Sequence, residues 1–142
     1  MTHSPEETER FAAELAGSLK KGTVLLLYGG LGAGKTAFAR GFARGLGIVE
    51  PVSSPTFTIV QEYAIPDGGM LYHMDLYRID DPESALAFGI DEFLEDPGAF
   101  CIVEWPERAE GLYPPGKTIR IDVTRDEAEP DIRTFSIRNP AS

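Results

Sequence analysis

Gly29-Gly30-Leu31-Gly32-Ala33-Gly34-Lys35-Thr36 decides the fold of this chain, because it fits the phosphate-loop pattern G-x-x-x-x-G-K-[ST]. Its glycines permit backbone angles that other residues resist, so successive N–H groups can point at phosphate oxygens. Lys35 brings a positive charge to the β- and γ-phosphates, and Thr36 offers a hydroxyl to Mg²⁺. The residues of this stretch expected to contact the nucleotide are Gly30, Gly32, Ala33, Gly34, Lys35, Thr36 and Ala37.

The sequence on either side places this loop between a strand and a helix. Residues 23–28 are a short, mostly apolar run, typical of a buried parallel strand. From Phe38 to Leu46, apolar residues recur every three or four positions, which indicates a helix with one buried face. Strand, glycine loop and helix therefore follow in the order that a phosphate site requires.

The rest of the chain predicts both helices and antiparallel strand pairs. Ser4 and Pro5 begin a helix in which Ser4 is the cap and Glu7 completes a capping box. Further segments follow it: strands at 57–63, 70–75, 100–104, 118–124 and 133–138, and short helices at 82–88, 90–94 and 107–111. We expect residues 1–142 to form a single α/β domain, a P-loop NTPase with a mixed parallel and antiparallel sheet flanked by helices.

The amino-acid composition excludes several classes of function. The chain has 13 basic and 23 acidic residues among 142, a formal net charge of −10. Such a chain repels the backbone of nucleic acid, so we expect no DNA binding and a preference for a basic protein partner. The one cysteine, Cys101, excludes an internal disulfide, and no apolar stretch is as long as a membrane span. These features suit a cytoplasmic protein without membrane contact.

Two acidic residues end predicted strands, where a P-loop enzyme needs a carboxylate for Mg²⁺. Glu104 follows the more apolar strand, which favours a central place beside the loop, so we assign Glu104 to the metal with Thr36. Asp75 is then left to orient the attacking water or accept its proton, with Lys35 as the other catalytic residue. The reverse assignment of the two acids stays open.

Other residues qualify for supporting roles. The loop at 53–56 is rich in hydroxyls, and Thr56 or Ser54 can reach the metal if it closes over the γ-phosphate, although an ordinary turn explains it equally well. Trp105 follows Glu104 and is expected at the rim of the nucleotide site. Arg78 and Arg108 are candidates for stabilising transition-state charge. We expect His73 to form a hydrogen bond in the core, or one to a residue that itself contacts the ligand or metal.

Three segments after the phosphate loop make the pattern more specific. They are Ser53-Ser54-Pro55-Thr56-Phe57, His73-Met74-Asp75-Leu76-Tyr77-Arg78 and Val103-Glu104-Trp105-Pro106-Glu107. In this order the series resembles the TsaE family, formerly YjeE, of small bacterial P-loop ATPases, over nearly the whole chain.

The resemblance implies a function that the residues alone do not give. Family members support synthesis of the N6-threonylcarbamoyl group on adenosine 37 of tRNA. They bind and hydrolyse ATP while docked on a heterodimer of TsaB and TsaD. The acidic charge of this chain agrees with a protein that reaches tRNA mainly through these partners. By resemblance Lys35 and Thr36 hold phosphate and Mg²⁺, Glu104 holds Mg²⁺, and Asp75 serves catalysis. Thr56 then belongs to a switch-like loop, and Trp105 matches the family tryptophan beside the site.

The sequence has three alternative interpretations: a GTPase, a small-molecule kinase and a nucleotide-switched binding module. A GTPase of the Ras type reads guanine with N-K-x-D, which is absent here. A small-molecule kinase usually carries an arginine-bearing lid, where this chain has the hairpin predicted between residues 57 and 75. A binding module that nucleotide switches without significant turnover is the remaining alternative.

Overall fold

The computed structural model describes residues 2–29, 34–52, 59–129 and 132–138. Within them, six strands form one sheet in the order β2-β3-β4-β1-β5-β6. The strands are β1 (Val24–Tyr28), β2 (Val60–Ala64), β3 (Met70–Asp75), β4 (Ala99–Glu104), β5 (Thr118–Arg125) and β6 (Arg133–Arg138). The helices are α1 (Pro5–Ser18), α2 (Lys35–Gly45), α3 (Pro82–Ala87), α4 (Ile90–Leu94) and the 3₁₀ helix η1 (Pro106–Ala109).

Strand direction is mixed, as the sequence predicted. The inner strands β3, β4, β1 and β5 are parallel to one another. Each edge strand is antiparallel to its neighbour, β2 to β3 and β6 to β5. The two predicted hairpins are therefore confirmed, although β2 begins at Val60 and residues 57 and 58 of the expected strand lie outside the described residues.

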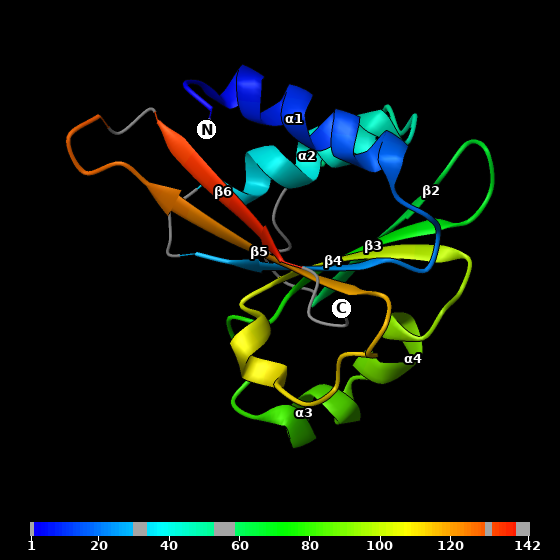
Figure 1. Cartoon of the computed structure of the whole chain (residues 1–142). Coiled ribbons are helices and arrows are strands. Elements are labelled where there is room, and N and C mark those ends of the chain that lie inside the picture. The colour runs from blue at the N-terminus through cyan, green and yellow to red at the C-terminus, as the bar shows by residue number, and fades with distance from the viewer. Residues whose placement is uncertain (1, 30–33, 53–58, 130–131, 139–142) are drawn as a thin grey trace.

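The sheet separates two layers of core. Alternate residues of β1 face opposite sides, so Leu25 and Leu27 join the cluster beneath α1 and α2, whereas Val24 and Leu26 join the cluster on the α3 and α4 side. Figure 1 shows α1 and α2 over one face and α3 and α4 over the other. This burial on both faces explains why β1 reads as an unbroken apolar run.

Local sequence signals set most element boundaries. The Ser4 side chain accepts a hydrogen bond from the Glu7 N–H at 3.1 Å and caps α1. Gly89, with φ 76°, separates α3 from α4, because this left-handed conformation is easiest for glycine. The predicted helical turn at 107–111 lies slightly earlier, as η1, since Pro106 suits a first helical turn. None of the helices in the described part is long and apolar enough to cross a membrane.

Two glycines let α2 approach α1 closely. A Cβ atom at Gly41 would lie 2.2 Å from the backbone oxygen of Glu9, and one at Gly45 would lie 2.5 Å from that of Ala13. Real Cβ atoms do not come so near to backbone atoms, so α1 and α2 pack almost backbone to backbone. Because α2 begins at Lys35, this packing fixes the helix that carries the phosphate-loop lysine.

We predict that Gly41→Ala destabilises the protein by about 1–3 kcal/mol, the usual cost of overpacking, or more if α2 cannot shift. Gly17→Ala is the matched control, since Gly17 also lies within a helix, α1, but nothing lies within 4 Å of its added Cβ. That control should instead gain about 0.5–1 kcal/mol from helix propensity. Denaturant unfolding measures both values, and equal effects of the two substitutions would contradict the close approach.

Candidate functional site

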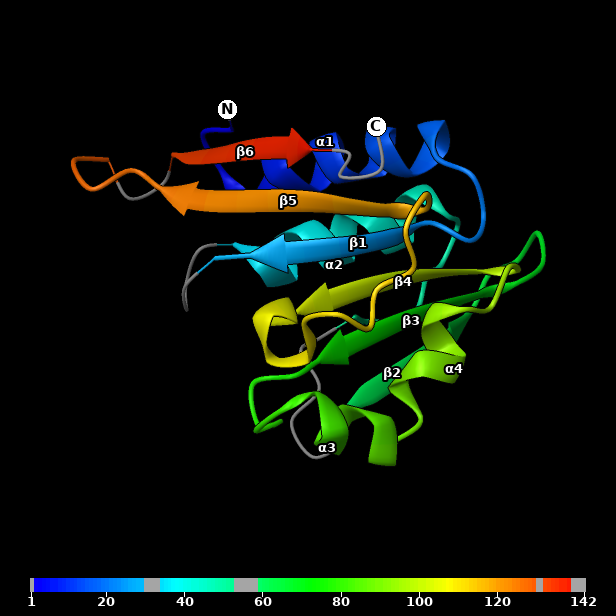
Figure 2. The ribbon, with the colours of Figure 1, turned by 60° about the horizontal axis from the view of Figure 1, so that its bottom comes forward.

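The site lies where the carboxyl ends of the parallel strands meet. Figure 2 shows β1, β3 and β4 ending at the same edge of the sheet, and the chain leaves β1 there for the phosphate loop. Glu104 pairs in register with Leu27 on β1 and with Asp75 on β3. The expectation that β4 lies beside the loop strand is therefore confirmed, and both candidate acids end neighbouring strands.

Only part of the predicted phosphate loop is described. Gly30, Gly32, Ala33 and Thr56 lie outside the described residues, as does Ser54. Gly34 has φ 101°, a left-handed conformation that favours glycine, and it is the cap residue of α2. Thr36 and Ala37 lie in the first turn of α2, at the helix end that attracts anions.

Lys35 has an unusual environment. Its side chain is almost buried, and its Nζ has no hydrogen-bond partner among the described residues. The Nζ instead lies 4.2 Å from the centroid of the Trp105 ring, a cation–π contact. Burial lowers the pKa of Lys35, while the nearby carboxylates of Glu104, Asp75 and Glu107 oppose that shift. A buried cation without an acceptor is suited to receive an anionic ligand.

Trp105 lies against the loop lysine, and its expected place at the rim of the nucleotide site stays a prediction. Its φ of 59° makes it the sole non-glycine with positive φ in the described segments. For a bulky residue such an angle is rare and costs of order 1–3 kcal/mol, so strain of this kind tends to be found at functional sites. The Trp105 ring also packs against Tyr77, with centroids 4.9 Å apart. The strained turn therefore places the indole between Lys35 and Tyr77, and the Tyr77 side chain is half exposed.

Glu104 contacts a buried histidine, His73, of the neighbouring strand β3. Its carboxylate Oε2 lies 2.6 Å from His73 Nε2, and both side chains are almost completely enclosed. This confirms the core hydrogen bond expected for His73. A carboxylate that is fixed on one side by the core can present its second oxygen to the site.

Asp75 is more accessible than Glu104. Its Oδ1 accepts a hydrogen bond from the Tyr77 N–H at 3.0 Å. Burial raises the pKa of Asp75, and the nearby Glu104 carboxylate raises it further, whereas the Tyr77 N–H, Lys35 and His73 lower it. A raised pKa makes this carboxylate a better proton acceptor than an exposed one.

The structure adds residues that sequence reasoning missed. Tyr77 and Glu107 both adjoin the site, one against Trp105 and the other near Lys35. The pairing of Asp75 with Glu104 brings the segments after β3 and β4 together, but that register is not visible in the sequence. Arg78 is exposed and Arg108 is half buried, and the roles suggested for them stay predictions.

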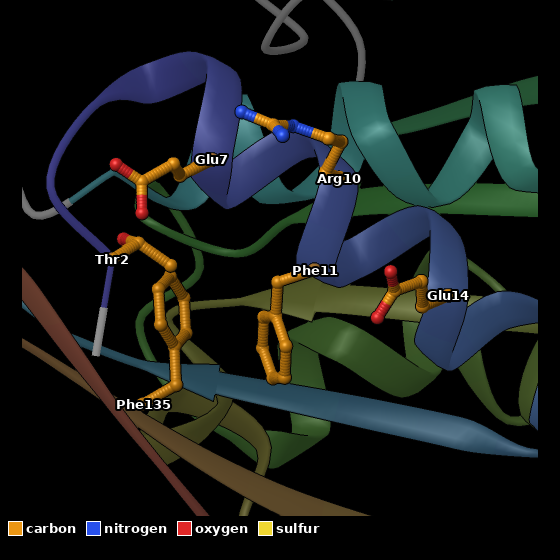
Figure 3. Close-up of a pocket in the computed structure, with 6 residues that line it drawn as sticks. All are labelled: Thr2, Glu7, Arg10, Phe11, Glu14 and Phe135. Atoms are coloured by element: carbon orange, nitrogen blue, oxygen red, sulfur yellow. The ribbon is translucent and has the colours of Figure 1, made fainter.

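A separate hollow of about 280 Å³ lies between the start of α1 and β6. In Figure 3, Phe11 of α1 and Phe135 of β6 lie side by side there, with ring centroids 5.2 Å apart. Thr2 belongs to its lining and bridges to Arg133 of β6, whose Nε would lie 3.3 Å from a Cβ at Gly34. β6 thus comes close to Gly34 at the start of α2, on the β5–β6 flank of β1, whereas both candidate acids lie on its β3–β4 flank.

Comparison with known proteins agrees with this arrangement. The model of the family described as "Threonylcarbamoyl adenosine biosynthesis protein TsaE" matches residues 2–134. The chain belongs to the TsaE family.

Two curated relatives illustrate the similarity. TsaE of Bacillus subtilis is 50% identical over 114 residues, covering 80% of this chain and 69% of that protein. TsaE of Haemophilus influenzae is 43% identical over 95 residues, covering 67% of this chain and 59% of that relative, which is less than two thirds of its length. Both carry the name tRNA threonylcarbamoyladenosine biosynthesis protein TsaE.

A solved structure confirms the fold class. The crystal structure of YdiB from Bacillus subtilis superposes with a TM-score of 0.74 at 41% identity, covering 97% of this chain and 82% of that one. The predicted class, an α/β P-loop NTPase with a mixed sheet flanked by helices, is therefore correct for this TsaE-family chain.

We predict that Trp105 emission reports the titration of Lys35. Burial disfavours the ammonium form, so Lys35 should lose its proton below the pH of 10.5 typical of lysine. Loss of the charge 4.2 Å from the indole should change the emission. The experiment uses a Tyr77→Phe background, because ionised Tyr77 would also affect its ring neighbour. A transition that persists in Lys35→Met would disprove the assignment.

Proposed function

We propose that this chain binds and hydrolyses ATP with Mg²⁺ as an accessory subunit required for threonylcarbamoylation of adenosine 37 in tRNA. The observation that carries the nucleotide site is the buried Lys35 Nζ without a hydrogen-bond partner in the described part of the chain. A buried donor without an acceptor costs the folded protein about 1–3 kcal/mol of stability, unless a ligand accepts its hydrogen bond. A triphosphate on the G-K-T sequence of the loop supplies the missing acceptor.

The residues present also suit Mg²⁺. This ion takes few protein ligands, usually one or two carboxylates together with phosphate and water. Thr36 at the start of α2 and Glu104 at the end of β4 offer a hydroxyl and a carboxylate near Lys35. Among the described residues no group of three or more His, Cys, Asp or Glu side chains is arranged to hold a metal alone, which fits an ion that arrives with its nucleotide. Bound Mg²⁺ would draw negative charge from the phosphate oxygens.

The remaining site residues divide the work of hydrolysis. Lys35 binds the β- and γ-phosphates and offsets the charge that develops on them. Asp75 orients a water molecule for attack on the γ-phosphorus and can accept its proton, helped by its raised pKa. A new bond forms from the water oxygen to phosphorus as the bond to the bridging oxygen breaks, which gives ADP and phosphate.

The partner proposal rests on family membership and charge. We propose that the chain acts on a complex of TsaB and TsaD and reaches tRNA only through it. The relatives are named for tRNA threonylcarbamoyladenosine biosynthesis, and a net charge of −10 is unfavourable for direct contact with the tRNA backbone. Turnover is expected to be slow without the partners.

A second candidate is a module that nucleotide switches without significant turnover. It is favoured by the ring contact between Trp105 and Tyr77, since Tyr77 is 49% exposed. A phosphate that draws Lys35 away from the Trp105 indole would free the indole to move. That movement would shift Tyr77, which lies at the surface. Hydrolysis measured with and without the partner complex separates the two candidates.

We predict that Asp75→Asn keeps ATP affinity within about threefold but loses most hydrolysis, because binding does not need the base, whereas general-base catalysis is worth 10²–10⁴-fold. Glu104→Gln should instead weaken the Mg²⁺ dependence of binding. Calorimetry and phosphate release measure these effects, and Lys35→Ala is the control that loses ATP binding. If Asp75→Asn loses the Mg²⁺ dependence, the two acidic roles are reversed.

We also predict that omitting this chain from purified TsaB, TsaD and the remaining modification enzymes stops multiple-turnover formation of threonylcarbamoyladenosine on tRNA. Wild-type chain should restore it, whereas Lys35→Ala should not. Mass spectrometry of digested tRNA measures the product. Full modification without the chain would refute the accessory role while leaving the ATPase assignment intact.

A further inference from the structure

We propose that His73 positions Glu104 for the metal: the buried imidazole holds carboxylate oxygen Oε2, so that Oε1 is the oxygen presented to Mg²⁺. This inference rests on the proposed function, which assigns Glu104 to Mg²⁺. It concerns a residue that contacts neither nucleotide nor metal itself and acts only through the carboxylate.

The sheet register explains how the two side chains meet. His73 pairs with Ile102, and Asp75 pairs with Glu104 two residues further along both strands. Residues two apart in a strand share a face, so His73 and Glu104 are diagonal neighbours on the side of α2 and Lys35. Leu27 of β1 lies beside Glu104 on that face and is fully buried. The other neighbours of Glu104 on this face are Asp75, in register with it, and Lys35, so among the described residues the His73 ring is the hydrogen-bond partner that anchors the carboxylate.

The hydrogen bond fixes one oxygen of the carboxylate. His73 Nε2 is 2.6 Å from Glu104 Oε2, whereas Nδ1 has no partner in the described part of the chain. The tautomer with its proton on Nε2 donates that N–H to Oε2 and avoids a buried unpaired donor at Nδ1. Oε2 is then held by the ring, and Oε1 is the oxygen left for the site.

Loss of this donor should affect the metal more than the nucleotide. Glu104 is only 4% exposed, and the anchored Oε2 would lose its hydrogen bond. Outer-shell partners of this kind typically contribute 10–100-fold to metal affinity. Phosphate contacts from Lys35 and the loop do not depend on the His73 ring, so nucleotide binding without metal should persist.

The test is a Mg²⁺ titration of affinity for a non-hydrolysable ATP analogue in His73→Phe, His73→Met and His73→Gln. We expect the first two to need about tenfold more Mg²⁺, because neither side chain has a donor, while affinity in excess chelator stays within about threefold. His73→Gln retains an N–H that can reach Glu104 and should recover most of the effect. His73→Met covers the case in which the phenyl ring is not accommodated, since methionine adapts to irregular space.

Met74→Ala is the matched control for stability alone. Met74 is also fully buried on β3 but belongs to the cluster on the other side of the sheet. It should lower the unfolding temperature without changing the Mg²⁺ requirement. Wild-type Mg²⁺ dependence in His73→Phe and His73→Met, or an equal shift in Met74→Ala, would overturn the positioning role. Absence of Mg²⁺-dependent binding in the wild type would instead overturn the proposed function on which it rests.

Discussion

The buried ammonium group of Lys35 is the constraint on which the site depends. Its environment combines the Trp105 ring with the carboxylates of Glu104, Asp75 and Glu107 and offers no hydrogen-bond acceptor among the described residues. The three nearby carboxylates offset the charge of the ammonium group, which weakens its attraction for an anion without abolishing it. A divalent cation between the acids and the phosphate oxygens would relieve this opposition of charges, which is why we propose a nucleotide that binds together with its metal.

The scaffold keeps this costly arrangement in place. The adjacent strands β3, β4 and β1 place the two acids and the start of the phosphate loop at one edge of the sheet. The close contact of α1 with α2 at Gly41 fixes the helix that carries Lys35. Apart from Glu9 Oε1 on α1, the buried side-chain atoms without a hydrogen-bond partner in the described part of the chain are Lys35 Nζ and His73 Nδ1, and these lie at the site together with the strained φ of Trp105. Such local conflicts are typical of sites that a ligand or a partner completes.

A series of side-chain contacts connects the site with the protein surface. Lys35 contacts Trp105, and Trp105 contacts Tyr77, whose backbone N–H binds Asp75. One indole therefore adjoins the Lys35 ammonium group and the segment that holds the proposed base. A protein bound over Tyr77 and a nucleotide bound at Lys35 would act on the same aromatic pair, which is a concrete basis for coupling turnover to partner binding.

Sequence patterns determined the local elements and the chemistry of the loop. The Ser4 cap, the break at Gly89 and the strand Met70–Asp75 follow from backbone preferences and short-range hydrogen bonds, which act within a few residues. Glycine spacing identified the phosphate loop for the same reason. The sequence could also name Asp75 and Glu104 as candidate acids, because both end apolar strands.

Only the tertiary structure decided how these parts meet. The parallel register of β3 with β4 sets Asp75 beside Glu104 and brings His73 diagonally to the same carboxylate. A shift of one residue would turn those side chains to the other face, and no local preference fixes it. Lys35 meets Trp105 across seventy residues of chain because β1 and β4 are neighbours in the sheet. Contacts at this separation depend on strand order and packing, which form only when the whole chain folds.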